Sequence, residues 1–214
     1  MQYLKYSYLY LPLVLLIIKT ITMSKIDYSK ELKPIALPLN EDIFWELVEN
    51  SIQNSTNEDE QEAYLIKALE KLTPYEIIGF RLMTDKLLYD TYTSHMWCAG
   101  YIINGGCSDD GFEYFRNWVI SCGKEVYYKA KENPDTLIDV IKDGDEDFFE
   151  LESFWYVALQ AFNNVTGLEL YDYIDYENHL TREGKYPNFE FDWNDDEPET
   201  LQAICPQLYE RCWY

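Results

Sequence analysis

Residues 104–124 read NGGCSDDGFEYFRNWVISCGK and contain two consecutive helix boundaries. The Gly-Gly pair predicts the end of one helix, because glycine adopts left-handed backbone dihedrals at low cost. Ser108 predicts the N-cap of the next helix, with Asp109 and Asp110 in its first turn, where the helix dipole favours negative charge. Inward-facing positions then recur at helical spacing, at Phe112, Phe115, Val119 and Cys122. The stretch therefore predicts a helix–turn–helix corner.

Similar boundary signals on both sides of this corner predict further helices. Thr73, Pro74 and Glu76 form a capping box with proline at the first helical position. Asn40 is placed to cap a helix that starts with two acidic residues. The predicted helices lie at about 41–50, 58–72, 74–92, 94–103, 109–122, 124–132, 134–143, 148–163, 170–180 and 199–212, the last one broken or kinked at residue 206.

The composition fits a single folded domain of the all-α class. Of the 214 residues, 47% are hydrophobic, which is ample for a core, and the 9 glycines and 8 prolines are too few for an all-β chain with many tight turns. We predict a multi-helix globular domain at residues 41–167, preceded by an extended lead-in at 23–40. Residues 168–214 form a short, irregular, acidic and aromatic-rich C-terminal extension, which we expect to pack on the domain.

The N-terminal residues 1–22 form a separate apolar segment with a lysine on each side of its most apolar part. A cleaved signal peptide is disfavoured, because Thr20 to Met23 offers a poor cleavage site. Translation could start at Met23, which predicts a cytoplasmic protein. Alternatively, residues 3–23 could anchor the protein in a membrane, since this stretch is just long enough to span one. We favour the start at Met23.

The charge is strongly unbalanced, with 39 acidic and 17 basic residues and a net charge of −22. Phosphate contacts require a cationic surface, so we expect no nucleic-acid partner, and anionic membranes are disfavoured for the same reason. The acidity either maintains solubility or attracts a basic protein partner. Residues 168–199 contribute strongly to it, with 11 acids against 2 bases.

Five cysteines, an odd number without a C-x-x-C pair, predict free thiols rather than a disulfide framework. His95 and Cys98 are spaced for one face of a helix, and Cys107 follows nearby. With His179 as a distant fourth ligand, these residues could hold a zinc ion. Buried free cysteines are common in protein cores, however, and we predict no metal and no cofactor. The sequence contains no Gly-rich phosphate loop, no H-E-x-x-H and no G-x-S-x-G motif.

The corner concentrates polar residues that a ligand site could use, namely Asn104, Asp109, Asp110 and Arg116. Arg116 could pair with one aspartate and leave the other to bind a cation or polarise water. Helix caps use the same residue types, so an architectural role is the competing interpretation.

Aromatic residues near the corner suggest a second kind of site. Trp97, Tyr101 and Trp118 could line a ligand groove, because tyrosine and tryptophan favour binding surfaces. The competing interpretation is that these rings belong to the core, as we expect for most of the 6 tryptophans and 20 tyrosines of the chain.

Several motifs occur in an order that one family shares. Phe44-Trp45 comes first, then Trp97-x-Ala-x-Tyr-x-Ile103, the Gly-Gly-Cys-Ser-Asp-Asp-Gly-Phe turn with its Phe-Arg-x-Trp, and finally Asn133-Pro-Asp-x-Leu137. In these motifs the chain resembles the bacterial family catalogued as domain of unknown function 4240, over about residues 42–167. The resemblance implies a shared fold and brings no established activity or catalytic residues.

Two functions from different classes fit these observations. The preferred hypothesis is a non-enzymatic interaction module, an adaptor or inhibitor whose acidic face engages a basic protein partner. The alternative is an enzyme, or a small-ligand or cation binder, that uses the corner of Asp109, Asp110 and Arg116. The sequence leans away from an enzyme, because two histidines leave a histidine-dependent nucleophile triad little to work with.

Overall fold

The computed structural model describes residues 26–142, 148–179 and 186–213. Within these ranges the chain is helical, with two isolated β-bridges and no strands, so the all-α prediction is confirmed. The α-helices are α1 (Tyr28–Glu31), α2 (Glu41–Gln53), α3 (Glu58–Leu69), α4 (Pro74–Asp90), α5 (Ser94–Asn104), α6 (Asp109–Ser121), α7 (Lys124–Glu132), α8 (Val157–Thr166), α9 (Pro198–Ile204) and α10 (Pro206–Cys212). The 3-10 helices are η1 (Pro134–Asp139), η2 (Glu152–Tyr156) and η3 (Leu170–Tyr173).

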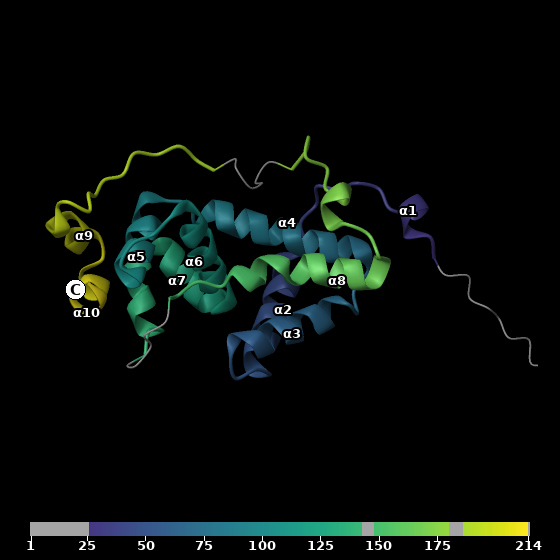
Figure 1. Cartoon of the computed structure of the whole chain (residues 1–214), viewed down its shortest axis with the longest axis horizontal. Coiled ribbons are helices and arrows are strands. Elements are labelled where there is room, and N and C mark those ends of the chain that lie inside the picture. The colour runs from purple at the N-terminus through teal and green to yellow at the C-terminus, as the bar shows by residue number, and fades with distance from the viewer. Residues whose placement is uncertain (1–25, 143–147, 180–185, 214) are drawn as a thin grey trace, which may run out of the picture.

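Helix α4 is the centre of the fold (Figure 1). Buried residues occur around its whole circumference, which is typical of a helix enclosed by others. Helices α2, α6 and α8 pack against it, while α3 packs on α8 and α7 packs on α6. The molecule is elongated along α4, with α8 beside it, α1 near one end and α5, α9 and α10 at the other (Figure 1).

The predicted helix starts are confirmed by their hydrogen bonds. Thr73 and Glu76 form the reciprocal capping box at the start of α4. The Ser108 hydroxyl accepts a hydrogen bond from the backbone amide of Gly111 at 3.0 Å. Gly105 ends α5 with a left-handed φ of 65°. The corner is therefore the helix–turn–helix junction that the sequence predicted.

Three predicted helices are shorter than expected and partly of another type. The segment after Asn133 is the 3-10 helix η1, which ends at Asp139, and the segment before α8 contains η2 instead of one long helix. The helix predicted at 170–180 is reduced to η3. Apolar residues three apart suit both helix types, so their periodicity does not distinguish a 3-10 turn from an α-helix. The lead-in that we expected to be extended includes the short helix α1.

The C-terminal tail returns along the helical body (Figure 1). Helix α8 ends at Thr166 with Gly167 as its C-cap, and the described parts of the tail then contact α4 and α5. Helices α9 and α10 pack on α5. They are separated at Cys205 and Pro206, as predicted, because proline has no amide hydrogen to continue the helical ladder.

No helix within the described ranges combines the length and the hydropathy that crossing a bilayer requires. The apolar segment predicted at residues 1–22 lies outside the described residues. The choice between a start at Met23 and a membrane anchor at residues 3–23 therefore stays a prediction.

Candidate functional site

The structure places the four residues of the predicted corner in different environments. Asp109 and Asp110 are exposed in the first turn of α6, whereas Arg116 is 1% exposed. Asn104 lies at the end of α5, and its Oδ1 accepts a hydrogen bond from the backbone amide of Phe149 at 2.9 Å. No ion pair among the described residues joins Arg116 to either aspartate. Arg116 follows Asp109 by seven residues of helix, which is about 10 Å along the helix axis. The guanidinium of Arg116 therefore contacts nearer acceptors instead of this carboxylate.

Arg116 connects three parts of the fold. Its Nε donates to the carbonyl oxygen of Phe112 at 3.2 Å, and its Nη1 donates to that of Leu88 at 2.5 Å. The guanidinium also lies 5.0 Å from the ring of Tyr92 and 4.8 Å from that of Tyr186. Burial lowers the pKa of Arg116, and contact with Tyr186 opposes this. Arg116 thus links α6 to α4 and to the tail.

The three predicted groove residues do not share one groove. Trp118 packs within the body against two phenylalanines. Trp97 and Tyr101, one turn apart on α5, are covered by Phe191 and Trp193 of the tail, at ring-centroid distances of 5.6 and 5.3 Å. The tail therefore lies over Trp97 and Tyr101, where the groove hypothesis placed a ligand.

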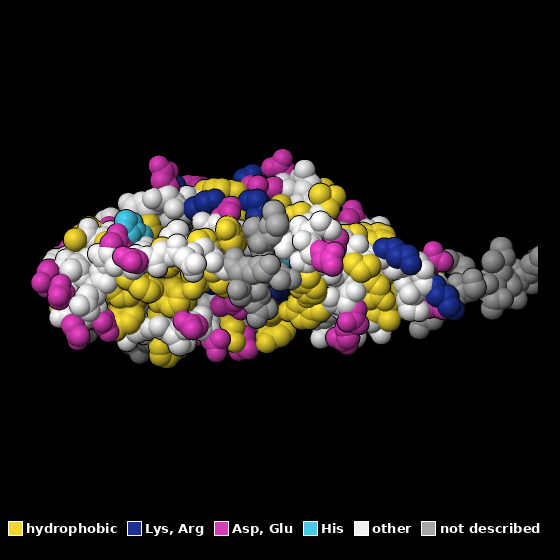
Figure 2. All heavy atoms as spheres, turned by 90° about the horizontal axis from the view of Figure 1, so that it is seen from above, with side chains coloured by type: hydrophobic (Ala, Val, Ile, Leu, Met, Phe, Trp, Pro, Cys, Tyr) yellow, Lys and Arg dark blue, Asp and Glu magenta, His cyan; other side chains and the backbone are white. Residues whose placement is uncertain are grey.

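A row of rings continues from Tyr101 over the end of the molecule that α5, α9 and α10 form. Neighbouring ring centroids lie 5.2–5.9 Å apart in the order Phe191, Trp193, Tyr101, Trp213 and Tyr209. Phe191 is 50% exposed, and the other four are half-buried. Four exposed acids lie on the adjoining turn and the start of α9, namely Asp195, Asp196, Glu197 and Glu199. We call these rings and acids the acidic–aromatic face. Figure 2 shows hydrophobic surface bordered by acidic side chains at this end.

None of the ion pairs among the described residues involves the acids of this face. Asp195 accepts a hydrogen bond from the Tyr101 hydroxyl at 3.0 Å. Partial burial, followed by this contact, raises the pKa of Tyr101. Carboxylates beside partly exposed rings attract lysine and arginine, through charge and through cation–π contact.

A polar contact fixes the tail beside this face. Asp192 Oδ2 lies 2.7 Å from His95 Nε2, and Asp192 Oδ1 accepts a hydrogen bond from the Ser94 hydroxyl. Hydrogen bonding to Ser94, and then to His95, lowers the pKa of Asp192 despite its partial burial. The Ser94 hydroxyl bonds to the carboxylate rather than to the imidazole, so the three residues lack the nucleophile–base contact of a hydrolytic triad.

Sequence reasoning missed a buried charged cluster beneath the tail. Arg81 Nη2 lies 2.8 Å from Asp85 Oδ1, and His179 Nε2 lies 3.1 Å from Asp85 Oδ2. All three residues are at most 6% exposed, and Arg81 stacks on the Trp155 ring at 3.3 Å. The i, i+4 spacing of Arg81 and Asp85 was the available signal. Their burial and their contact with the distant His179 depend on how the tail packs.

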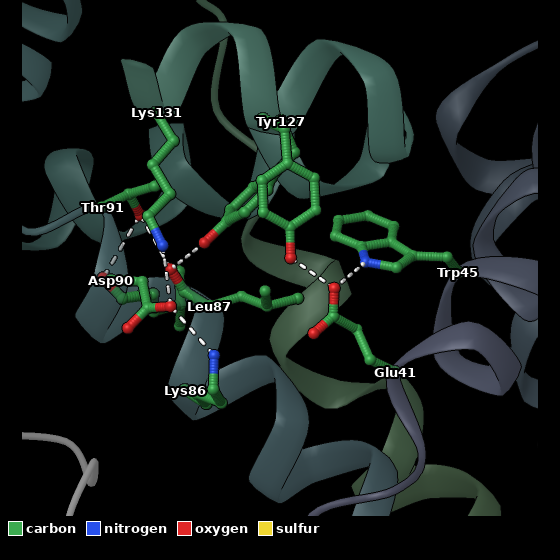
Figure 3. Close-up of polar contacts among 10 residues, drawn as sticks. Glu41, Trp45, Lys86, Leu87, Asp90, Thr91, Tyr127 and Lys131 are labelled. Atoms are coloured by element: carbon green, nitrogen blue, oxygen red, sulfur yellow. Dashed lines mark hydrogen bonds and ion pairs between the residues drawn. The ribbon is translucent and has the colours of Figure 1, made fainter.

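A second network connects α2, α4 and α7 (Figure 3). Asp90 Oδ2 lies 2.9 Å from the ammonium groups of both Lys86 and Lys131. Burial raises the pKa of Asp90, but hydrogen bonds from Lys131 and Lys86 outweigh it, so the pKa is lowered. Glu41 accepts a hydrogen bond from the indole of Trp45 at 3.4 Å. These acids of the body therefore have partners within the protein.

The residues considered as zinc ligands lie in separate environments. The two histidines contact different carboxylates, as described above. Cys98 is buried against α9, with its Sγ 3.9 Å from the carbonyl oxygen of Leu201. Burial raises the pKa of Cys107 to about 12, which disfavours its thiolate. Within the described ranges, no three His, Cys, Asp or Glu side chains are grouped to hold a metal ion.

The family described as Protein of unknown function (DUF4240) matches residues 39–164, which is more than half of the chain. The match runs from the start of α2 into α8, includes the corner, and ends before the tail. No curated protein and no solved structure matches the chain. By this match over its helical body, the chain belongs to the DUF4240 family of proteins of unknown function.

Proposed function

We propose that this protein is an interaction module that binds a basic protein partner through the acidic–aromatic face. The supporting observation is that none of the four acids of this face takes part in an ion pair among the described residues. Asp85 and Asp90 in the body, by contrast, are paired with arginine and lysine. Exposed carboxylates without an ion pair among the described residues, beside half-buried and exposed rings, form a surface that a cationic partner would complement.

A lysine- or arginine-rich segment fits this face in two ways. Its charges are attracted to the carboxylates, and a guanidinium can also stack on a tryptophan or tyrosine ring. Tyrosine and tryptophan supply much of the binding energy at many protein interfaces. The net charge of −22 would mainly accelerate association. An adaptor or inhibitor would act by covering the basic surface of its partner.

A matched pair of double variants tests this function. Asp195→Asn/Asp196→Asn on the face and Asp109→Asn/Asp110→Asn at the corner remove the same charge from exposed positions. A short arginine-rich peptide is the probe, and calorimetry at low and high salt is the measurement. We expect the face variant to weaken binding roughly five- to thirtyfold at low salt, from about 0.5–1 kcal/mol for each of the two exposed charge contacts. The corner variant should bind like the parent.

The remaining outcomes separate the alternatives. Equal weakening by both double variants would mean that the peptide responds to net charge without a site, and the face would be rejected. Weakening confined to the corner variant would favour the alternative, a ligand- or cation-binding corner. Trp193→Ala should weaken binding without a change in charge, because it removes a ring of the face. The same variants can then be compared in pull-downs from the native host, where raised salt should reduce capture of a basic protein.

A further inference from the structure

The tail segment Tyr186–Asn194, which we name the strap, lies across the junction between α4 and α5 without helical structure. It is outside the residues that match the family. Every second side chain of its last part meets an aromatic ring of the body. The ring pairs are Phe189 with Tyr92 at 5.6 Å, Phe191 with Trp97 at 5.6 Å and Trp193 with Tyr101 at 5.3 Å. Alternate side chains of an extended segment point the same way, so such a segment can present three rings to one surface.

The strap is bound mainly through its side chains, and the Asp192 amide also donates to the Ser94 hydroxyl at 3.3 Å. The Asp192 carboxylate contacts Ser94 and His95, and the Trp193 indole donates to the backbone carbonyl of Ser94 at 2.9 Å. No described backbone group of the strap hydrogen-bonds to a backbone group of the helical body. Recognition at this site therefore depends mainly on the order of side chains, and a segment of another chain with the same order could bind there. We call Tyr92, Ser94, His95, Trp97 and Tyr101 the groove.

The strap fills its site incompletely. Cavities of about 380 and 370 Å³ lie along it, and both are bordered by Thr93 and Ser94. Phe191 is 50% exposed, and the Asp192 side chain is 56% exposed. A segment with so much exposed surface opens at a lower free-energy cost than the core.

We propose that the groove is a peptide-binding site and that the strap is its built-in occupant. A partner protein would displace the strap with an extended segment that has aromatic residues at alternate positions and a carboxylate between the last two. The Ser94 hydroxyl and the His95 imidazole would receive that carboxylate, and Lys131 borders the adjoining cavity. This proposal does not rest on the basic partner. Phe191 and Trp193 of the strap also belong to the acidic–aromatic face, so displacement of the strap would remove two rings from that face.

The experiment uses the full chain and a fluorescent peptide with the strap sequence, residues 186–194, as the probe. Phe191→Ala/Asp192→Asn weakens the strap at two exposed positions. The apparent dissociation constant equals the intrinsic one divided by the fraction of open groove, so we expect this variant to bind the peptide about tenfold more tightly than the parent. Fluorescence anisotropy measures the binding, and circular dichroism checks that the variant is folded.

Two controls test the recognition itself. A peptide with serine in place of both phenylalanines should bind neither protein. Adding His95→Gln to the weakened strap should reduce binding of the original peptide, because the contact with its aspartate is lost. Equal affinity of parent and variant for the strap peptide, or equal binding of the serine peptide, would overturn the proposal. If the double variant does not fold, Phe191→Ala alone provides the same comparison. The variants of this experiment leave Asp195 and Asp196 unchanged. The peptide-groove proposal can therefore fail while the proposal of a basic partner stands.

Discussion

Carboxylates in the helical body and at the end of the tail have different neighbours. Asp85 lies in a buried pair with Arg81, and Asp90 contacts two lysines. Asp195 meets a tyrosine hydroxyl, and no ion pair of the described residues reaches Asp196. The same residue type is therefore held in ion pairs in one region and lacks an ion pair among the described residues in the other. The net charge of −22 conceals this division.

The largest expected effect is a difference in unfolding free energy between a variant of the body and a variant of the tail. Asp85→Ala leaves Arg81 buried without its carboxylate, which should cost about 3–5 kcal/mol of unfolding free energy. Asp196→Ala, at an exposed position of the tail, should cost less than about 0.5 kcal/mol. Urea unfolding followed by tryptophan fluorescence measures both. Similar losses for the two variants would contradict the distinction between body and tail.

A smaller effect tests whether the corner belongs with the structural residues of the body. Ser108→Ala removes the hydroxyl that accepts from the Gly111 amide, and should lower the unfolding free energy by about 1 kcal/mol. Thermal and urea unfolding are the measurements, and binding of the arginine-rich peptide should be unchanged. A variant of parental stability that had lost a binding activity would instead place the corner among the functional sites.

The pH dependence of stability should reveal the pairing of Asp90. Contacts with Lys131 and Lys86 keep the folded pKa of Asp90 below its usual value of 3.8. A lowered folded pKa adds stability above the unfolded value, and this stability is lost as the pH falls through the folded pKa. Asp90→Asn should therefore cost less than about 1 kcal/mol at neutral pH and flatten the decline in stability below about pH 4.

The measurement for Asp90 is the urea midpoint from neutral to acidic pH. Lys86→Met/Lys131→Met removes the cause of the lowered pKa and should flatten the same acidic limb. If either variant kept the parental slope below pH 4, the lysine contacts would not account for the acid sensitivity.

The smallest effect on stability is expected for the acids of the acidic–aromatic face, which take part in no ion pair among the described residues. Asp195→Asn/Asp196→Asn/Glu197→Gln should change the unfolding free energy by no more than about 0.5 kcal/mol, and relief of repulsion between like charges favours a slight gain. The midpoint of thermal unfolding, compared at low and high salt, measures this change. A loss of unfolding free energy well above about 1 kcal/mol would show that these acids stabilise the packing of the tail, which would contradict a role confined to partner binding.

The sequence by itself determined the helical class and most helix starts. Thr73 and Ser108 act on amides within three residues, so their roles depend only on neighbours in the chain. Residues 134–139 and 152–156 were predicted as parts of α-helices and form 3-10 helices, because the spacing of apolar residues does not separate these two types. The motif order likewise identified the family that matches residues 39–164.

Only the tertiary structure decided which charges meet. One hypothesis paired Arg116 with an aspartate at the corner, yet it donates to the carbonyl of Leu88, 28 residues away in sequence. His179 reaches Asp85 across 94 residues, and no local pattern indicated this contact. The tail likewise covers Trp97, one of the residues that could have lined a ligand groove. Such contacts depend on how the whole chain packs, because burial removes water as a partner and each polar group must then find one among distant residues.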